Sequence, residues 1–201
     1  WEATGCASSA RSSGEPRFPR TGRSLIESLV VAPREVYDLV FRCARVAGCD
    51  PGTADRVARN VMVAEARWGG AVAVAVGVFE AEDPAGSAPV RAPDVLAEAE
   101  CDARTTGSAR AEFEAPVPLA FLVSTIAEMA GRGVVVDDLP IDATAGLPVP
   151  GLGLRTGVAD RPSSVEAHRG GLSVDRVAFN RLEAMAGRFL VSEAILDGIE
   201  P

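Results

Sequence analysis

A pair of amphipathic helices is encoded by the sequence PREVYDLVFRCARVAGCDPGTADRVARNVMVAEARW, residues 33–68. Pro33 suits the first position of a helix, and Gly48 is the residue type that most often follows a helix end. Asp50 is expected to begin the second helix, because its carboxylate accepts backbone amides of the first turn and Pro51 follows directly. The apolar residues recur every three or four positions, which predicts a helical hairpin.

The two expected helices each have one continuous apolar face. On the first helix this face comprises Val36, Val40, Cys43, Ala44 and Ala47. On the second helix it comprises Ala54, Val57, Ala58, Val61 and Trp68. Opposite charges four residues apart predict two ion pairs on the outer faces, Asp38–Arg42 and Asp55–Arg59.

The apolar segment Ala71–Phe79 follows a break at Gly69-Gly70. Its alternation is typical of a strand, but alanine is a poor strand former and an all-apolar run also fits a buried helix. The resemblance described below favours the helix. The segment is about half as long as the roughly 20 residues that a membrane-spanning helix needs.

The following residues are expected to form a loop and a short helix. Residues 82–93 contain Asp-Pro, Gly-Ser and two further prolines, which predicts a loop. Asp94 is a suitable cap for a short helix ending at Glu100. Residues 101–115 are ambiguous, with a strand expected near Ala111–Ala115.

A second helical pattern begins after Pro118 and is closed by Gly131 and Gly133. Its apolar face comprises Leu119, Leu122, Val123, Ile126, Ala127 and Ala130. Val134–Val136 is expected to be a strand. Residues 137–162 are rich in proline and glycine, which predicts a long loop with little regular structure.

The last part of the chain adds a strand and helices. Val165–His168 is an expected strand, and a long C-terminal helix is expected to start at Ser173 or Asp175. A short helical turn is expected over Ser192–Gly198. The sequence therefore predicts an α+β or α/β fold that is mostly helical, with an N-terminal helical hairpin, a small sheet and a long C-terminal helix.

Composition excludes several functions. The net charge of −8 argues against nucleic acid or an anionic membrane as a partner. All 20 basic residues are arginine, so the chain has no lysine for a Schiff base or a phosphate-binding P-loop. The abundance of Ala, Gly, Arg and Val favours a bacterial source. We expect a soluble, cytoplasmic protein.

Residues 1–24 differ in composition from the rest and are expected to be a disordered leader. They contain four Arg, two acidic residues and five Ser, with Trp1 and Phe18 as the bulky apolar residues. One interpretation is a cloning remnant or untranslated upstream sequence, with the true start near Leu25–Val31; the other is a natural disordered tail. Residues 25–201 are expected to form a single globular domain.

Metal and cofactor sites are not expected. No pair among the four cysteines has ligand spacing, and His168 is the only histidine. We interpret Cys43 and Cys101 as small apolar residues and place His168 on the surface. Asp137, Asp138 and Asp142 are interpreted as a solvated turn, since they lack the spacing of a calcium loop.

The segment Gly151–Gly157 superficially matches a phosphate-binding loop. Its spacing, G-x-G-x-x-x-G, is one residue longer than the dinucleotide fingerprint, and neither a buried strand before it nor a helix after it is predicted. We therefore expect a structural loop.

The strongest candidate for a ligand site is the end of the second helix. It comprises Glu65, Arg67, Trp68, Gly69 and Gly70. Arginine binds anions, the tryptophan ring offers a stacking face, and glycines permit close approach of a ligand to the backbone. The alternative is structural, with Arg67 at the helix C-terminus, Trp68 in the core and Gly69 as the cap.

The hairpin, in residues 33–48 and 54–67, resembles the N-terminal helices of type-2 malate/lactate dehydrogenases. It resembles still more an uncharacterised bacterial domain family of about 200 residues, as does the C-terminal stretch VDRVAFNRLEAMAGRFLV, residues 174–191. In the dehydrogenases an Arg-Gly-x-x-Ser-His-Gly motif with the catalytic histidine follows the second helix. Aligned from Arg67, this chain has Trp68 for the first glycine and Ala71-Val72-Ala73 for Ser-His-Gly.

The missing histidine implies a shared scaffold without dehydrogenase activity, because valine cannot transfer a proton. The leading hypothesis is a non-catalytic domain that binds a small ligand or a partner protein. The alternative is an oxidoreductase-related protein that binds a nicotinamide nucleotide or a small organic acid. A third hypothesis is a structural subunit of a larger enzyme.

Overall fold

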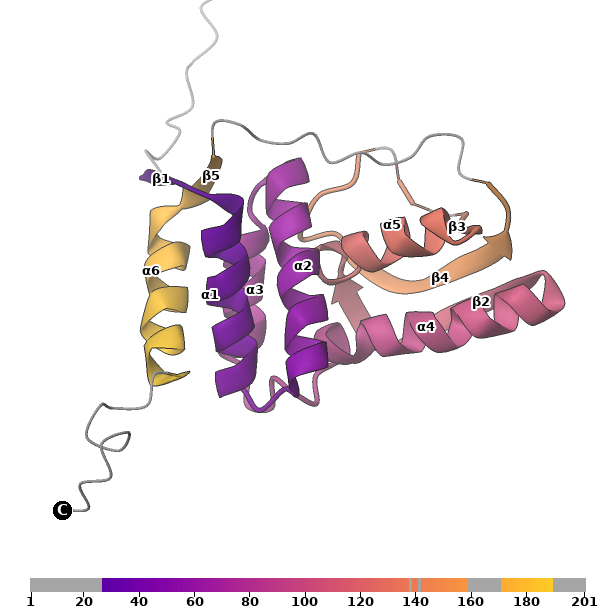
Figure 1. Cartoon of the computed structure of the whole chain (residues 1–201), viewed down its shortest axis with the longest axis horizontal. Helices are drawn as coiled ribbons and strands as arrows, with labels where there is room; N and C mark the ends of the chain where they lie inside the picture. Colours follow the sequence, from indigo (N-terminus) through magenta and orange to yellow (C-terminus); the bar gives the residue numbers. More distant parts are fainter. Residues whose placement is uncertain (1–26, 138, 141, 159–170, 190–201) are drawn as a thin grey trace, which may run out of the picture.

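The computed structural model describes residues 27–137, 139–140, 142–158 and 171–189 (Figure 1). Its α-helices are α1 (Pro33–Val46), α2 (Pro51–Trp68), α3 (Ala71–Phe79), α4 (Ala88–Thr106), α5 (Val123–Gly131) and α6 (Arg176–Ala186). Its strands are β1 (Ser28–Val31), β2 (Ser108–Pro118), β3 (Val134–Val136), β4 (Pro148–Thr156) and β5 (Leu172–Asp175). The leader, Asp138, the strand expected at 165–168 and the turn expected at 192–198 lie outside the described residues.

The fold is α+β and mostly helical, as the sequence predicts. Strands β1 and β5 form an antiparallel pair, and β2, β4 and β3 form an antiparallel sheet in that order. Figure 1 shows α6, α1 and α2 side by side, with α3 behind them and the three-stranded sheet on the far side of α2. Helix α2 contacts α1 and α3 on one side and α4 and α5 on the other, so it connects the two halves of the structure.

The helical hairpin is confirmed, and local capping explains its bounds. The Glu35 carboxylate accepts the amide of Ala32, 2.8 Å away, at the start of α1. Asp50 accepts the amides of Gly52 and Thr53 at 2.8 and 3.1 Å and so caps α2. The ion pair Asp55–Arg59 is present.

The other expected pair, Asp38–Arg42, is wrong. Asp38 instead pairs with Arg34, whose Nε lies 2.9 Å from Oδ1, one helical turn earlier. Both spacings are geometrically equivalent on a helix, so sequence does not distinguish them.

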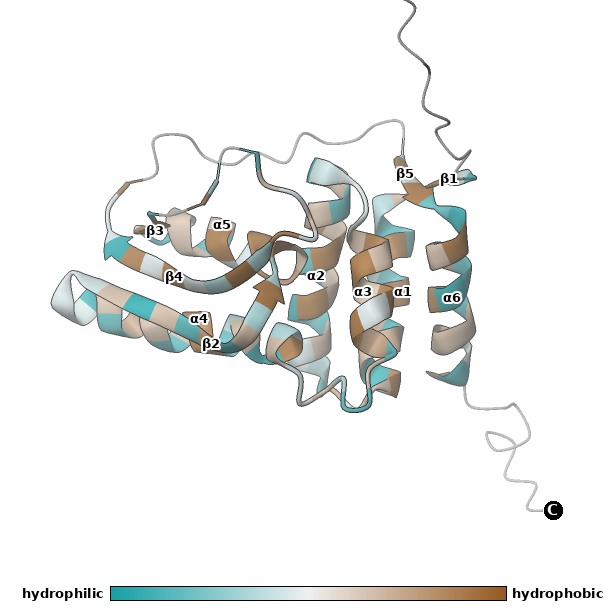
Figure 2. Ribbon diagram, turned by 180° about the vertical axis from the view of Figure 1, so that it is seen from behind, coloured by the Kyte–Doolittle hydropathy of each residue, from teal (hydrophilic) through white to brown (hydrophobic). Residues whose placement is uncertain are grey.

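Segment Ala71–Phe79 is helix α3. Figure 2 shows hydrophobic residues over most of its surface, which fits its position between α1, α2 and α6. Its buried residues, Ala71, Val72, Ala75, Val76 and Phe79, lie on one face. The other face is also built of Ala, Val and Gly, so the sequence lacks the polar positions that mark an amphipathic helix. The favoured interpretation is therefore confirmed.

Two predicted loops are shorter than expected, because each runs into a regular element. Helix α4 already begins at Ala88, inside the loop expected at 82–93, and continues to Thr106, well past Glu100. Pro93 lies inside α4 and is buried there together with Val90, Ala92 and Leu96. Proline cannot donate a helical hydrogen bond, and we attribute its tolerance to this packing.

The long loop expected at 137–162 contains strand β4. Val149, Leu152 and Leu154 are buried on β4, and Pro148 and Pro150 lie in the part of β4 that pairs with β2 but not with β3. Gly151 is required by close packing, because a Cβ there would lie 2.7 Å from the backbone oxygen of Ala111 in β2. Strand β1 was also not expected from the sequence.

Candidate functional site

The end of α2 and the start of α3 are joined through the buried side chain of Glu65. Its carboxylate accepts the backbone amides of Val72, at 2.8 Å, and Gly70, at 3.2 Å. Only 5% of the Glu65 surface is exposed. Burial raises the pKa of the Glu65 carboxyl above its ordinary 4.5, and the amide hydrogen bonds oppose that rise. Glu65 therefore satisfies the N-terminus of α3 instead of facing a ligand.

The two glycines of the predicted site belong to the same junction. Gly69 and Gly70 have φ angles of 72° and 74°, a left-handed region that non-glycine residues avoid. A Cβ at either position would meet nothing within 4 Å. Backbone conformation, and not the close approach of another group, accounts for both glycines.

Arg67 and Trp68 differ from the other three predicted residues, because both line a cavity. The guanidinium carbon of Arg67 lies 5.0 Å from the centre of the Trp68 ring, a cation–π arrangement. The cavity has a volume of about 220 Å³. It is lined by Arg67, Trp68, Leu119, Val123, Ile126, Ala127, Ala130, Leu139, Pro140 and Ala143.

Helix α5 forms much of the cavity wall and is held by a second buried polar residue of α2. The Asn60 side-chain oxygen accepts the amides of Ser124, at 2.8 Å, and Thr125, at 3.2 Å. Its nitrogen donates to the Arg56 carbonyl, at 3.0 Å, and to the Thr125 hydroxyl, at 3.1 Å. Asn60 thus caps the first turn of α5 from another helix. Asn60 is not among the residues predicted for the site, although an amide side chain between the apolar positions Val57 and Val61 indicates a buried polar group.

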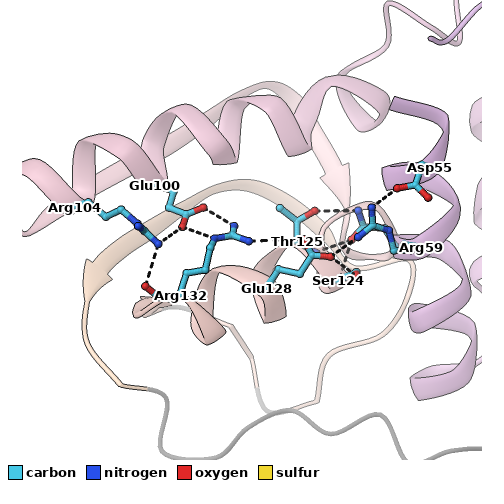
Figure 3. Close-up of polar contacts among 9 residues, drawn as sticks. Asp55, Arg59, Glu100, Arg104, Ser124, Thr125, Glu128 and Arg132 are labelled. Atoms are coloured by element: carbon cyan, nitrogen blue, oxygen red, sulfur yellow. Dashed lines mark hydrogen bonds and ion pairs between the residues drawn. The ribbon is translucent and has the colours of Figure 1, made fainter. Parts of the chain in front are cut away.

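Ion pairs attach the same helix to its neighbours (Figure 3). Glu128 of α5 lies 2.9 Å from Arg59 of α2, and Arg132 lies 2.6 Å from Glu100 of α4. Arg104 also contacts Glu100, at 3.0 Å. The hydrogen bond from Arg132 lowers the pKa of the Glu100 carboxyl, and burial opposes that effect. These contacts fix α5 so that Ile126, Ala127 and Ala130 line the cavity.

The remaining sequence candidates lie elsewhere. Most of segment 151–157 belongs to strand β4, so the prediction of a structural loop there is wrong. Asp137 forms an ion pair with Arg155. Cys43 is buried and donates to the Leu182 carbonyl at 3.3 Å, and burial raises its thiol pKa to about 12. Cys101 is a free thiol and is exposed, unlike Cys43.

His168 lies outside the described residues. Within them, no group of three or more His, Cys, Asp or Glu side chains has the arrangement of a metal site. No described helix combines the length and the apolar character required to cross a bilayer.

Comparison with known proteins gives no relative: no protein-family model, curated protein or solved structure matches this chain. The resemblance to the dehydrogenase hairpin therefore stays a prediction. Val72, which takes the place of the catalytic histidine in that resemblance, is 1% exposed and packs in the core. The cavity beside Arg67 and Trp68 is the candidate functional site.

Proposed function

We propose that this protein is a non-catalytic binding domain that holds a small organic anion in the cavity between α2 and α5. The observation that carries the proposal is the placement of Arg67 and Trp68 on the wall of an otherwise mostly apolar cavity. Ligand sites commonly combine an apolar lining with a few polar groups that orient the ligand.

The charge of the cavity favours an anion. The whole chain has 28 acidic and 20 basic residues. Among the described residues that line the cavity, however, the charged side chain is the cationic one of Arg67. A planar guanidinium on an aromatic face is well suited to a carboxylate group.

The same lining argues for binding without catalysis. A guanidinium group offers hydrogen-bond donors and no acceptor atom, so Arg67 is suited to holding an anion and not to taking up a proton. The other lining residues of the described cavity carry apolar side chains. The position that the dehydrogenase resemblance assigns to a histidine holds Val72, buried in the core.

The proposal is tested by fluorescence titration of the full chain carrying Trp1→Phe, in which Trp68 is the only indole. The probes are hexanoate, malate, lactate and NAD. We expect a carboxylate to change the Trp68 emission in a saturable way. Arg67→Gln should weaken the affinity for that carboxylate by about 10- to 150-fold, the equivalent of about 1.5–3 kcal/mol for a charged hydrogen bond.

Arg91→Gln is the matched control, because Arg91 is an exposed arginine outside this cavity. It should leave the affinity unchanged. Equal affinities for the parent chain and Arg67→Gln would contradict the proposal. A dinucleotide is too large for a cavity of about 220 Å³. Tight binding of NAD with little binding of hexanoate would therefore contradict binding in this cavity and favour the nicotinamide alternative.

A further inference from the structure

Strand β2 has one open edge among the strands that the structure describes. The three-stranded sheet has the order β2-β4-β3, so β4 pairs with one edge of β2 and no other described strand pairs with the second edge (Figure 2). With 11 residues, Ser108–Pro118, β2 is the longest of the described strands. An open edge of this length is a template for pairing with another chain.

The backbone groups of Arg110 and Glu112 point toward this open edge. The Gly107 carbonyl accepts the amide of Thr156 of β4, 3.0 Å away. The oxygen of Ala111 also faces β4, at the close approach of the two strands described above. Backbone groups point alternately to the two sides of a strand. Those of the even-numbered residues Arg110 and Glu112 are therefore directed away from β4.

The side chains of the same two residues carry opposite charges. Arg110 Nε lies 3.2 Å from Glu112 Oε1, and the two side chains are 56% and 78% exposed on one face of the strand. Charged side chains normally protect an edge strand, because a strand of another protein would leave them without partners. A second copy of this chain differs from other strands in that it brings the opposite charges with it.

Charge selects one register for two β2 strands. An antiparallel pair with its two-fold axis at Ala111 sets Arg110 of each copy opposite Glu112 of the other. Both residues direct their backbone groups to the shared edge, so they would form hydrogen-bonded pairs. An axis at Arg110 or at Glu112 would instead set like charges face to face, which destabilises a sheet.

A cavity at the same edge fits this register. It has a volume of about 190 Å³ and lies between α4 and β2. In the register centred on Ala111, Ala109 of the second copy lies opposite Phe113, a half-buried wall of the cavity. A methyl group at this position adds apolar contact with little bulk. The cavity is lined by Ala88, Arg91, Val95, Glu112, Phe113 and Glu114.

We propose that two copies of this protein associate through β2, so that their three-stranded sheets join into one continuous antiparallel sheet with its two-fold axis at Ala111. Each copy has a net charge of −8, which opposes association wherever charges are not matched locally. The alternating Arg110 and Glu112 provide that match at the β2 edge. The dimer is independent of the proposed function, because the cavity between α2 and α5 shares no described lining residue with this edge.

Sedimentation equilibrium of the full chain over a concentration series tests the proposal. We expect a reversible equilibrium between monomer and dimer. The measurement is made at about 0.15 M salt, where screening over about 8 Å limits the long-range repulsion between two acidic chains.

Charge reversal tests the register. Arg110→Glu and Glu112→Arg change exposed side chains, where substitutions are usually tolerated. Each variant alone should have a dimer weakened by about tenfold or more, because both cross-strand pairs become repulsive. An equimolar mixture of the two variants should regain the dimer at the same total concentration, since one strand then offers two carboxylates and the other two guanidinium groups.

Arg34→Glu and Asp38→Arg are the matched controls, because they make the same charge changes at an exposed ion pair of α1. Each should dimerise like the parent chain. A parent chain that stays monomeric throughout the series overturns the inference. A dimer that either reversal at β2 leaves intact also overturns it, because the association then uses another surface. A mixture of the two β2 variants that stays monomeric overturns it as well, since opposite charges then do not meet.

Discussion

The Glu65 carboxylate, near the end of α2, accepts a 2.8 Å hydrogen bond from the backbone amide of Val72 in the first turn of α3. The residue at the N-cap position of α3 is Gly70, which has no side chain to supply this bond. One buried carboxylate thus takes the place of a local cap across a glycine turn. Asn60 does the same for α5, so α2 organises two later helices through polar side chains.

Replacing Glu65 by alanine should lower the free energy of unfolding by about 1–3 kcal/mol, because the buried amide of Val72 would be left without an acceptor and the amide of Gly70 would lose its hydrogen bond. Urea denaturation measures this. Glu65→Gln keeps one acceptor oxygen and should cost less than Glu65→Ala. Equal losses in the two variants would show that the hydrogen bonds do not matter.

Glu65 should also make stability depend on pH. Its pKa is raised in the folded state, so the folded protein binds more protons than the unfolded chain between pH 4.5 and that raised value. The contribution of Glu65 to the free energy of unfolding therefore falls as pH rises through this window. Relative to the parent chain, Glu65→Gln should gain stability as pH increases from 4 to 7. A constant difference would refute the raised pKa.

Glu100 should have the opposite pH dependence. Its lowered pKa means that the stability it contributes is present above its ordinary pKa of 4.5 and is lost as pH falls through the folded value. Glu100→Gln should cost about 1 kcal/mol at pH 7, near the lower end for charged hydrogen bonds because the Arg132 side chain is 46% exposed. Acid titration of both proteins should show the stability difference shrinking below pH 4.5.

Asn60→Ala should destabilise the protein by about 1–3 kcal/mol, because the first-turn amides of Ser124 and Thr125 lose their acceptor. Thermal or urea unfolding would measure the change. Asn180→Ala is the matched control, since Asn180 is exposed on α6, and it should have little effect. A similar loss in both variants would argue against capping of α5.

Oxidation of malate or lactate with NAD or NADP should stay below about 1 s⁻¹, the low end of ordinary turnover numbers. The reason is that Val72 occupies the position given to the catalytic histidine by the resemblance, and its side chain is in the core. Absorbance of the reduced cofactor at saturating substrate measures the rate. Faster turnover would mean that another side chain transfers the proton in place of the histidine.

The helical hairpin and the class of fold could be predicted because their signals are local. The start of each helix is set by residues within its first turn, Pro33 in α1 and Asp50 in α2. The spacing of valines and alanines defines the apolar face of each helix within one or two turns. In the candidate site, Arg67 and Trp68 line the same cavity, and the sequence places them together at a helix end. It grouped them with Glu65, which the structure turns toward α3 instead.

The other features depend on contacts between residues that are far apart in the chain. Strand β4 holds Pro148 and Gly151 because β2, some 40 residues earlier, pairs with one side of it and approaches closely at Ala111. Likewise, Asn60 caps α5 only because the fold places Ser124, 64 residues later in the chain, beside α2. The cavity arises where α2 and α5 pack beside Leu119, Leu139, Pro140 and Ala143. Local composition does not predict these long-range contacts, because the packing of the whole chain determines which residues are buried and which hydrogen-bond partners they meet.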